Sequence, residues 1–254
     1  FLLFKDHISG FTSGIVPSQS DIRVVLANNQ KNWKVNQILP NDLFEISPSI
    51  SGKVVALSEN TVAFIPEKKL NQGTEYQVTF KLSKIVAVKK ELEDFKFTVK
   101  TIKQDFIVNT HDIQSYNKNY QYLNCVVKFA DNIDFDDAKK LIEAKQNGDD
   151  LKIKFEKAPK SGTEFKFIID SIQRFDDESM VKINYDGDDA DIDREGTLEY
   201  TISSINDFKV MNVEIPDGNV QSLNINFSEP LEKGQDFAGL VSIQNTNNLR
   251  FSTQ

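Results

Sequence analysis

The sequence predicts an all-β protein made of tandem antiparallel β-sandwich modules, the last of them partial. Short stretches of alternating apolar and polar residues recur along the 254 residues, with turn residues between them. A turn glycine followed by an alternating strand occurs twice, at Gly73-Thr74-Glu75-Tyr76 and at Gly162-Thr163-Glu164-Phe165, and repeats of this size indicate a modular array. The 19 phenylalanines, against one tryptophan, suit the thin interior of a sandwich.

The first module is predicted over residues 1–101. Its turns are marked by serine, asparagine, glycine and proline, and Ser58-Glu59-Asn60 is predicted to form the tip of a hairpin. Short strands at this spacing, without long helical stretches, are typical of an antiparallel sandwich. The predicted strands cover residues 21–26, 53–57, 61–65, 74–82 and 93–100.

The second module is predicted over residues 102–202. A short helix or turn is expected within residues 134–144, because apolar side chains there share one helical face and early aspartates suit a helix N-terminus. The apolar pair Leu141-Ile142 has a counterpart in Leu43-Phe44 of the first module. The predicted strands cover residues 120–129, 151–155, 163–169, 181–185 and 197–202.

A partial third module is predicted over residues 203–254, with strands at 205–210 and 221–227. Its start matches the second module in spacing, since a phenylalanine, an aspartate and a leucine recur at nearly equal intervals: Phe129, Asp137 and Leu141, then Phe227, Asp236 and Leu240. The third copy of the apolar pair is Leu240-Val241-Ser242-Ile243, followed by Leu249-Arg250-Phe251. No third Gly-Thr-Glu strand follows, so we expect this chain to be part of a longer protein.

Composition narrows the function. A net charge of −8 argues against non-specific nucleic-acid binding, which needs clustered lysine and arginine. Apolar runs are only a few residues long, too short for a membrane-spanning helix. The single cysteine, Cys125, lies in a strand-like run and is interpreted as a small buried apolar residue.

The densest carboxylate run, from Asp186 to Glu195, is the candidate metal site. Oxygen ligands from one short loop suit Ca²⁺, but an EF-hand requires glycine at position six and a carboxylate at position twelve. Counted from Asp189, position six is Arg194, and counted from Asp191, position twelve is Ile202, so neither window fits. A solvated acidic loop is therefore the favoured interpretation. Zinc is disfavoured because His7, His111 and Cys125 form no cluster in the sequence.

The sequence also offers no catalytic constellation. His111-Asp112 is an adjacent pair whose side chains would diverge on a strand, and no Gly-x-Ser-x-Gly motif is present. Trp33 with Tyr116, Tyr120 and Tyr122 could form a sugar platform, although a packing role is favoured. No catalytic, cofactor-binding or metal-binding residue is assigned, and we expect binding, spacing or scaffold work rather than enzyme activity.

Two regions resemble a known family. The first includes Phe11-Thr12-Ser13-Gly14, Leu43-Phe44-Glu45-Ile46-Ser47-Pro48 and Thr61-Val62-Ala63-Phe64-Ile65-Pro66. The second includes Phe227-Ser228-Glu229-Pro230-Leu231 and Gln235-Asp236-Phe237-Ala238-Gly239-Leu240. These stretches resemble the immunoglobulin-like and macroglobulin-like domains that open bacterial alpha-2-macroglobulin proteins, especially the long forms of Bacteroidetes.

The resemblance implies an exported protein, periplasmic or extracellular and often lipid-anchored, that inhibits proteases. In that family a protease cuts a bait segment, and a Cys-x-x-Gln thioester couples to the attacker. Here Cys125-Val126-Val127-Lys128 lacks the glutamine, so no functional residue is carried over. The chain is expected to be a non-catalytic N-terminal scaffold that contacts neighbouring macroglobulin domains, with proteases engaged by the full-length protein. The alternative is an immunoglobulin-like stalk of a surface adhesin or surface-layer protein.

Overall fold

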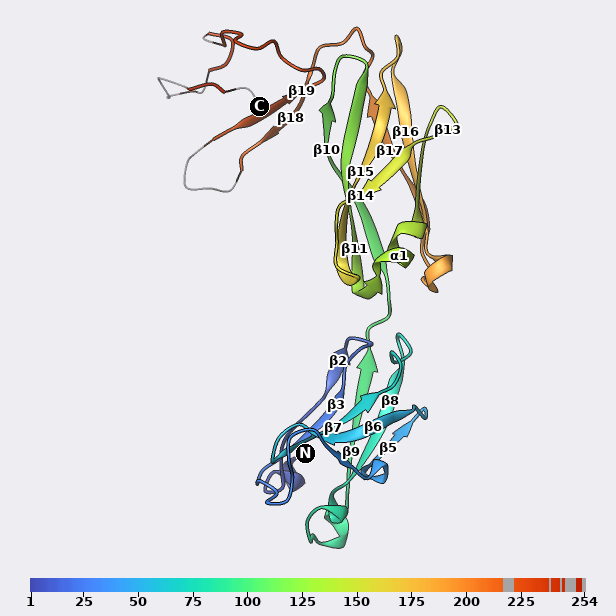
Figure 1. Cartoon of the computed structure of the whole chain (residues 1–254), viewed down its shortest axis with the longest axis vertical. Coiled ribbons are helices and arrows are strands. Elements are labelled where there is room, and N and C mark those ends of the chain that lie inside the picture. Colours follow the sequence, from blue (N-terminus) through green and yellow to red (C-terminus); the bar gives the residue numbers. More distant parts are fainter. Residues whose placement is uncertain (217–221, 238, 243, 245–249, 253–254) are drawn as a thin grey trace. The chain divides into compact units, whose positions relative to one another are not determined.

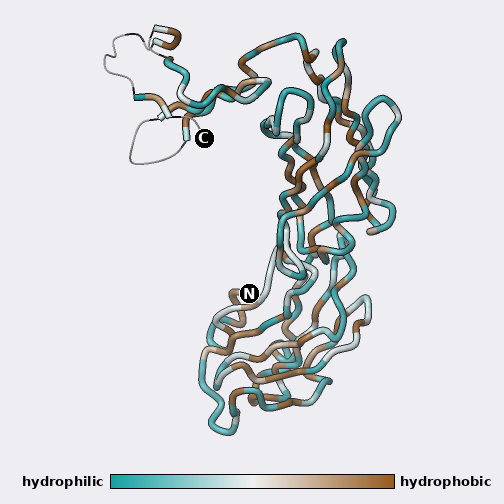
Figure 2. The backbone as a smooth tube through the Cα atoms, turned by 45° about the horizontal axis from the view of Figure 1, so that its top comes forward, coloured by the Kyte–Doolittle hydropathy of each residue, from teal (hydrophilic) through white to brown (hydrophobic). Residues whose placement is uncertain are grey.

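The computed structural model describes residues 1–216, 222–237, 239–242, 244 and 250–252 (Figure 1). Two compact units are present. Unit 1 comprises Phe1–Asp105 and Phe129–Ile133, and unit 2 comprises Phe106–Lys128 and Asp134–Gln254. The described residues are nearly all in strands, loops and single helical turns, and along the strands brown apolar residues alternate with teal polar ones (Figure 2). The predicted all-β fold class is confirmed.

The first sandwich consists of two sheets in unit 1. One has the strand order β1-β3-β7-β6-β4, and the other has the order β2-β9-β8-β5. All neighbouring strands are antiparallel except β2 and β9, which pair in parallel from Gly14↔Val99 to Val16↔Thr101. The bounds are β1 Ile8–Phe11, β2 Gly14–Val16, β3 Ile22–Leu26, β4 Gln37–Leu39, β5 Phe44–Ser47, β6 Gly52–Ala56, β7 Thr61–Pro66, β8 Glu75–Lys81 and β9 Asp94–Thr101.

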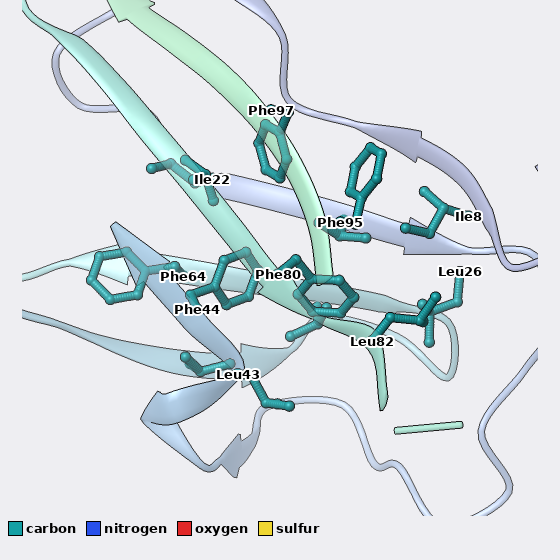
Figure 3. Close-up of a cluster of buried hydrophobic side chains, with 14 of the residues drawn as sticks. Ile8, Ile22, Leu26, Leu43, Phe44, Phe64, Phe80, Leu82, Phe95 and Phe97 are labelled. Carbon is teal, nitrogen blue, oxygen red and sulfur yellow. The ribbon is translucent and has the colours of Figure 1, made fainter. Parts of the chain in front are cut away.

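The core between these sheets combines phenylalanines, which the composition predicted there, with valines, leucines and isoleucines (Figure 3). Along β9 every second residue is buried, which directs Phe95 and Phe97 to the same face. The Phe95 ring lies 4.9 Å from the Phe4 ring and 5.0 Å from the Phe11 ring, while Phe44 and Phe80 are 5.1 Å apart. Each fully buried ring stabilises the fold by about 1.5–3 kcal/mol.

The second sandwich, which lies in unit 2 except for Phe129–Ile133 of β11, also has two sheets. Their strand orders are β10-β11-β15-β14 and β13-β12-β16-β17. β16 and β17 pair over their whole length, from Ser179↔Ile202 to Asp186↔Glu195. The bounds are β10 Phe106–Ser115, β11 Tyr120–Asp134, β12 Ile142–Gln146, β13 Asp149–Asp150, β14 Lys152–Phe155, β15 Ser161–Gln173, β16 Ser179–Asp186 and β17 Glu195–Ile202.

Among the described residues, helical structure is limited to short turns. The predicted helix within residues 134–144 exists as α1 (Phe135–Ala138) followed by the 3-10 turn η5 (Lys139–Leu141). The prediction was wrong beyond Leu141, because Ile142 begins β12 and pairs with Tyr185. The other 3-10 turns are η1 Leu2–Phe4, η2 Asn41–Leu43, η3 Leu82–Lys84, η4 Lys90–Leu92 and η6 Asp188–Ala190.

The ten predicted strands of the two sandwiches are all present, whereas β1, β2, β4, β5, β10, β12 and β13 were not predicted as strands. Of the two sequence patterns that recur in both modules, the apolar pair marks equivalent strands and the Gly-Thr-Glu pattern does not. Leu43-Phe44 and Leu141-Ile142 both mark a 3-10 turn entering an equivalent strand, β5 and β12. The two Gly-Thr-Glu strands are not equivalent: β8 lies between β9 and β5, but β15 lies in the opposite sheet of its sandwich.

The hairpin β18–β19 follows the second sandwich. β18 (Val210–Glu214) pairs antiparallel with β19 (Asn224–Phe227). The predicted strand at 205–210 was wrong for residues 205–209, where the backbone turns instead. Within the remaining predicted features, Gln221, Ala238, Ile243 and Leu249 lie outside the described residues. The division into modules at 101 and 202 and the partial third module stay predictions.

Candidate functional site

The most unusual polar site in the described part of the chain surrounds a buried arginine. Arg174 directly follows β15 and opens the loop that leads to β16. Its side chain is 2% exposed, and it is the largest of the fully buried side chains. The alternation of β15 places it there, since Ile172, two residues earlier, is also fully buried.

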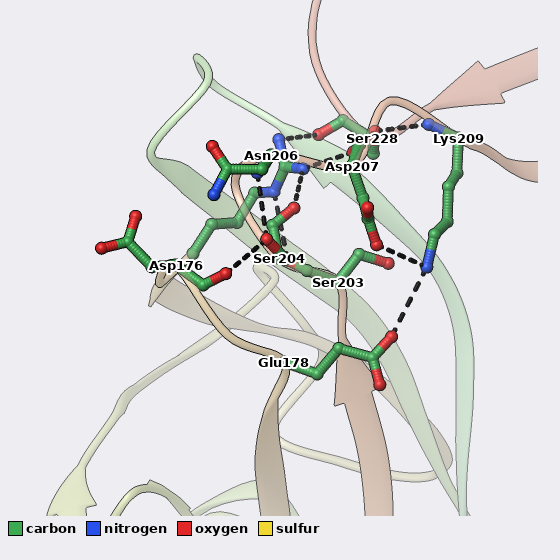
Figure 4. Close-up of polar contacts among 9 residues, drawn as sticks. Asp176, Glu178, Ser203, Ser204, Asn206, Asp207, Lys209 and Ser228 are labelled. Carbon is green, nitrogen blue, oxygen red and sulfur yellow. Dashed lines mark hydrogen bonds and ion pairs between the residues drawn. The ribbon is translucent and has the colours of Figure 1, made fainter.

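All five N–H groups of the guanidinium donate to backbone carbonyls. Figure 4 shows Ser203, Ser204, Asp207 and Ser228, which supply four of these carbonyls. Nε lies 3.3 Å from one oxygen, Nη1 lies 3.2 and 3.1 Å from two more, and Nη2 lies 2.5 and 2.7 Å from the last two. The donor capacity of an arginine is thereby filled. Nε donates to the Ser203 carbonyl. Nη1 donates to Lys118 and Ser228, and Nη2 donates to Ser204 and Asp207.

The charge of Arg174 is therefore balanced by carbonyl dipoles rather than by a carboxylate. A buried charge is costly unless it is hydrogen-bonded, and a buried carbonyl without a donor costs about 1–3 kcal/mol. The hydrogen bonds therefore lower the desolvation cost of both the buried guanidinium and the buried carbonyls. The carbonyls come from three places in the chain: the β10–β11 loop, the segment after β17 and the residue after β19.

Ser228 is the second focus of this cluster and is fully buried. Its carbonyl also accepts hydrogen bonds from Ser115 Oγ at 2.8 Å and Gln121 Nε2 at 2.9 Å. Its hydroxyl donates to the Asp207 carbonyl and accepts from the Lys209 N–H, both at 2.9 Å. The start of the hairpin and the residue after its second strand are thus fixed together.

An exposed ion-pair group borders the cluster. Lys209 Nζ lies 2.9 Å from Asp207 and 3.4 Å from Glu178, and the hydrogen bond to Asp207 is the main cause of its raised pKa. Exposed pairs of this kind contribute little to stability. Nearby, Ser204 Oγ donates to the Asp176 carbonyl at 2.6 Å. We define the Arg174 cluster as Arg174 with Ser115, Lys118, Gln121, Ser203, Ser204, Asp207 and Ser228.

Chemically, the guanidinium of Arg174 holds backbone carbonyls, and its five N–H groups are all used in doing so. No pattern in the sequence predicted this cluster. Its partners are backbone atoms, so no pattern of side chains marks them. The available signal was a charged residue that continues the buried alternation of a strand, Ile172 to Arg174.

The predicted surface position of the acidic loop is confirmed. Its carboxylates are exposed, whereas Ile192 is 2% exposed and anchors the loop. Among the described residues no group of three or more histidine, cysteine, aspartate or glutamate side chains is arranged to hold a metal ion. Within that same part of the chain, no helix is long and apolar enough to cross a membrane.

The remaining candidates lie mostly in the second sandwich. Cys125 is buried, as predicted, and burial raises its pKa to about 12. His111 is exposed on β10, and Asp112 accepts hydrogen bonds from the side chains of Gln114 and Asn124.

Of the predicted aromatic platform, the structure brings together Tyr116 and Tyr122, whose rings are 4.8 Å apart. Tyr116 donates to Asp170 Oδ1 at 2.9 Å, and Asp170 also pairs with Lys154. Tyr120 is partly exposed at 42%. Trp33 belongs to unit 1, where it packs against the core.

The strand orders define the class of fold. Immunoglobulin constant-type domains have strands A, B, E and D in one sheet and C, F and G in the other. The first sandwich has this order in β1, β3, β7 and β6 and in β5, β8 and β9, and the second has it in β10, β11, β15 and β14 and in β12, β16 and β17. Both are immunoglobulin-like β-sandwiches.

A tyrosine corner supports this assignment in the first sandwich. Tyr76 lies near the start of β8, the F strand, and is fully buried. Its hydroxyl accepts a hydrogen bond from the Asn71 N–H at 2.9 Å, which is the arrangement found near strand F of such domains. Two residues later, where antibody domains carry a cysteine, stands the buried Val78.

No protein-family model matches the sequence, and no curated protein matches it. Solved structures with similarity include the full ectodomain of mouse nectin-like molecule 4, at 10% identity over 88% of this chain and 81% of that chain, with a TM-score of 0.30. Bovine butyrophilin shares 10% identity over 76% and 95%, with a TM-score of 0.27.

A third similar structure is L,D-transpeptidase 3 from Mycobacterium tuberculosis in complex with a faropenem-derived adduct, at 10% identity and a TM-score of 0.28. The match covers 47% of this chain and 46% of that enzyme, so the chain spans less than half of it. Likeness at these TM-scores says nothing about activity.

Proposed function

We propose that this chain is a non-catalytic scaffold that positions other domains of the same polypeptide. One observation carries the proposal. Two sandwiches with the same strand order follow each other along the chain, and a buried arginine holds the segment that leaves the second one. A spacer needs a defined backbone path at its exits, and the five hydrogen bonds of the buried Arg174 support one.

In finer terms, we propose the N-terminal scaffold region of a bacterial alpha-2-macroglobulin-like protease inhibitor. The support is the sequence resemblance in residues 8–80 and 197–251, which includes Phe227-Ser228-Glu229-Pro230. Ser228 of that stretch is a focus of the Arg174 cluster, so the motif has a structural role here. The proposed location is the periplasm or cell surface, with a lipid anchor in the full-length protein. Proteases would be engaged by parts of that protein other than this chain.

The test begins with the complete reading frame. Macroglobulin repeats and a bait region downstream are expected, whereas a cell-wall anchor or sugar-binding domain would favour the alternative, a stalk of an adhesin or surface-layer protein. Protease inhibition is then measured for the full-length protein and for this chain alone. The full-length protein should inhibit endopeptidases, and this chain should not. A tight complex between the isolated chain and an endopeptidase would overturn the scaffold proposal.

A further inference from the structure

We propose that the Arg174 cluster is a rigid joint, which makes the second sandwich and the β18–β19 hairpin move as one body. This inference deepens the scaffold proposal and rests on it only for its biological purpose. The joint itself follows from the contacts of Arg174.

The guanidinium of Arg174 connects three places in the chain. One planar guanidinium bonds Lys118 of the β10–β11 loop, the segment from Ser203 to Asp207, and Ser228 after β19. The bonds to all three places share one rigid group. A swing of the hairpin must therefore break several bonds at once, rather than rotate about a single one.

A second observation concerns the linker. Residues 203–209, with two serines and no glycine or proline, connect β17 to the hairpin. A free segment of this kind would sample many backbone conformations. Here Ser203 and Ser204 are 7% and 9% exposed, and their carbonyls are bound by Arg174. Burial and hydrogen bonding remove that conformational freedom.

Two charged side chains link the second sandwich to the hairpin, and they differ in burial. Lys209 also joins the two parts, through Glu178 of the second sandwich, but both side chains are about half exposed. A solvent-exposed pair is too weak to fix an orientation. Ser115 and Gln121 of the sandwich also bond the Ser228 carbonyl, but neither reaches the linker, whereas Arg174 bonds both. Arg174 is therefore the main positioning residue of the joint, and Lys209 provides a matched comparison.

The experiment measures distances between two spin labels in the whole chain by pulsed electron paramagnetic resonance. Cys125→Ala removes the native thiol, and cysteines replace the exposed Lys166 in β15 and Glu214 in β18. A second pair, at Lys166 and Glu199, lies within the sandwich and reports on its folding. With Arg174 present, both pairs should give narrow distance distributions.

In Arg174→Met the joint pair should broaden markedly, while the pair within the sandwich stays narrow. Arg174→Lys keeps the charge but loses the fork, so intermediate broadening is expected. Lys209→Met and Arg23→Met, at exposed ion pairs, should leave the joint pair narrow. If Arg174→Met unfolds the sandwich and broadens both pairs, the lysine variant decides the question.

A broad joint distribution with Arg174 present, or a narrow one in both Arg174 variants, would overturn the rigid joint. Neither result bears on protease inhibition by the full-length protein. Conversely, a full-length protein without inhibitory activity would refute the finer proposed function and leave the joint intact. The two failures are thus distinguishable.

Discussion

The β7–β8 loop of the first sandwich and the equivalent β15–β16 loop of the second are held by different kinds of side chain, one neutral and one charged. In the first, the β7–β8 loop is held by the neutral hydroxyl of Tyr76, which accepts from Asn71 within that sandwich. In the second, the equivalent β15–β16 loop supplies its own cation, Arg174, which reaches the segment that follows the sandwich. One strand order thus accommodates two unrelated side-chain solutions. What the fold requires is that the buried backbone groups find partners.

Both loops also contact the chain segment that leaves their sandwich. Gln72, in the β7–β8 loop, accepts a hydrogen bond at 2.7 Å from the N–H of Gln104, shortly after β9. The Gly73 N–H of the same loop also donates to the Ile102 carbonyl at 3.0 Å. Arg174 alone makes three bonds to the segment after β17 and one each to Lys118 and Ser228. The difference in bond number predicts that loss of Arg174 has much the larger effect.

The largest expected effect is that of Arg174→Met. Several buried carbonyls lose their donor, partly offset because the buried charge is also removed, so unit 2 should lose about 3 kcal/mol of stability. Unit 1 should be unaffected. Trp33, the single tryptophan, belongs to unit 1, and its fluorescence during urea unfolding separates the two units when compared with far-ultraviolet circular dichroism.

Arg23→Met is the matched control, since Arg23 pairs with Asp21 on the surface of unit 1. Its effect should stay within about 0.5 kcal/mol. If the two substitutions were equally mild, the carbonyl cluster would have no special energetic role.

A smaller effect is expected for Tyr76→Phe, which tests the hydrogen bond made by the uncharged hydroxyl in the first sandwich. The ring remains and only the hydroxyl is lost, so the Asn71 N–H loses its acceptor at a cost of about 1–2 kcal/mol. The Trp33 unfolding midpoint should fall while the transition of unit 2 stays in place. Tyr120→Phe, at a partly exposed position, should change neither transition.

Much of the fold could be predicted from sequence because alternation is local information. β9 alternates buried and exposed residues without interruption, and its strand was predicted to within one residue. The strands that were missed include β2, β4 and β13, of three, three and two residues, which are too short to show a period. They exist because a neighbouring strand offers hydrogen bonds, and a single sequence does not reveal that pairing.

The Arg174 cluster could not be predicted for a related reason. Arg174 meets Ser203 at a separation of 29 residues and Lys118 at 56, and its partners are carbonyl oxygens that every residue carries. The strand wrongly predicted at 205–209 has the same cause, namely contacts with residues distant in the sequence. Its residues look strand-like, but Arg174 binds the Asp207 carbonyl and Ser228 bonds the backbone at Asp207 and Lys209.

The pH dependence of unit 2 gives a still smaller effect. The Lys154 hydrogen bond, followed by that of Tyr116, holds the pKa of Asp170 below its ordinary value of 3.8. A carboxyl group with a lowered folded-state pKa stabilises the protein at neutral pH, and this contribution is lost as the pH falls through that pKa. Asp170→Asn should therefore cost unit 2 about 1 kcal/mol at pH 7, and the difference should fade below pH 3.8. A difference that grew on acidification would contradict the assignment.

Cys125 offers a comparison that needs no substitution to the core. Cys125 is 3% exposed, and burial, with a smaller contribution from Asp112, raises the pKa of its thiol to about 12. At pH 8 the thiol is both protonated and shielded, and only the thiolate is reactive. Ellman's reagent should thus label the native chain slowly and the urea-unfolded chain fast. Because Cys125 lies in β11 within unit 2, Arg174→Met should accelerate native-state labelling, whereas Tyr76→Phe should not. Rapid labelling of the unmodified native chain, or acceleration by both substitutions alike, would show that the two loops do not secure their sandwiches independently.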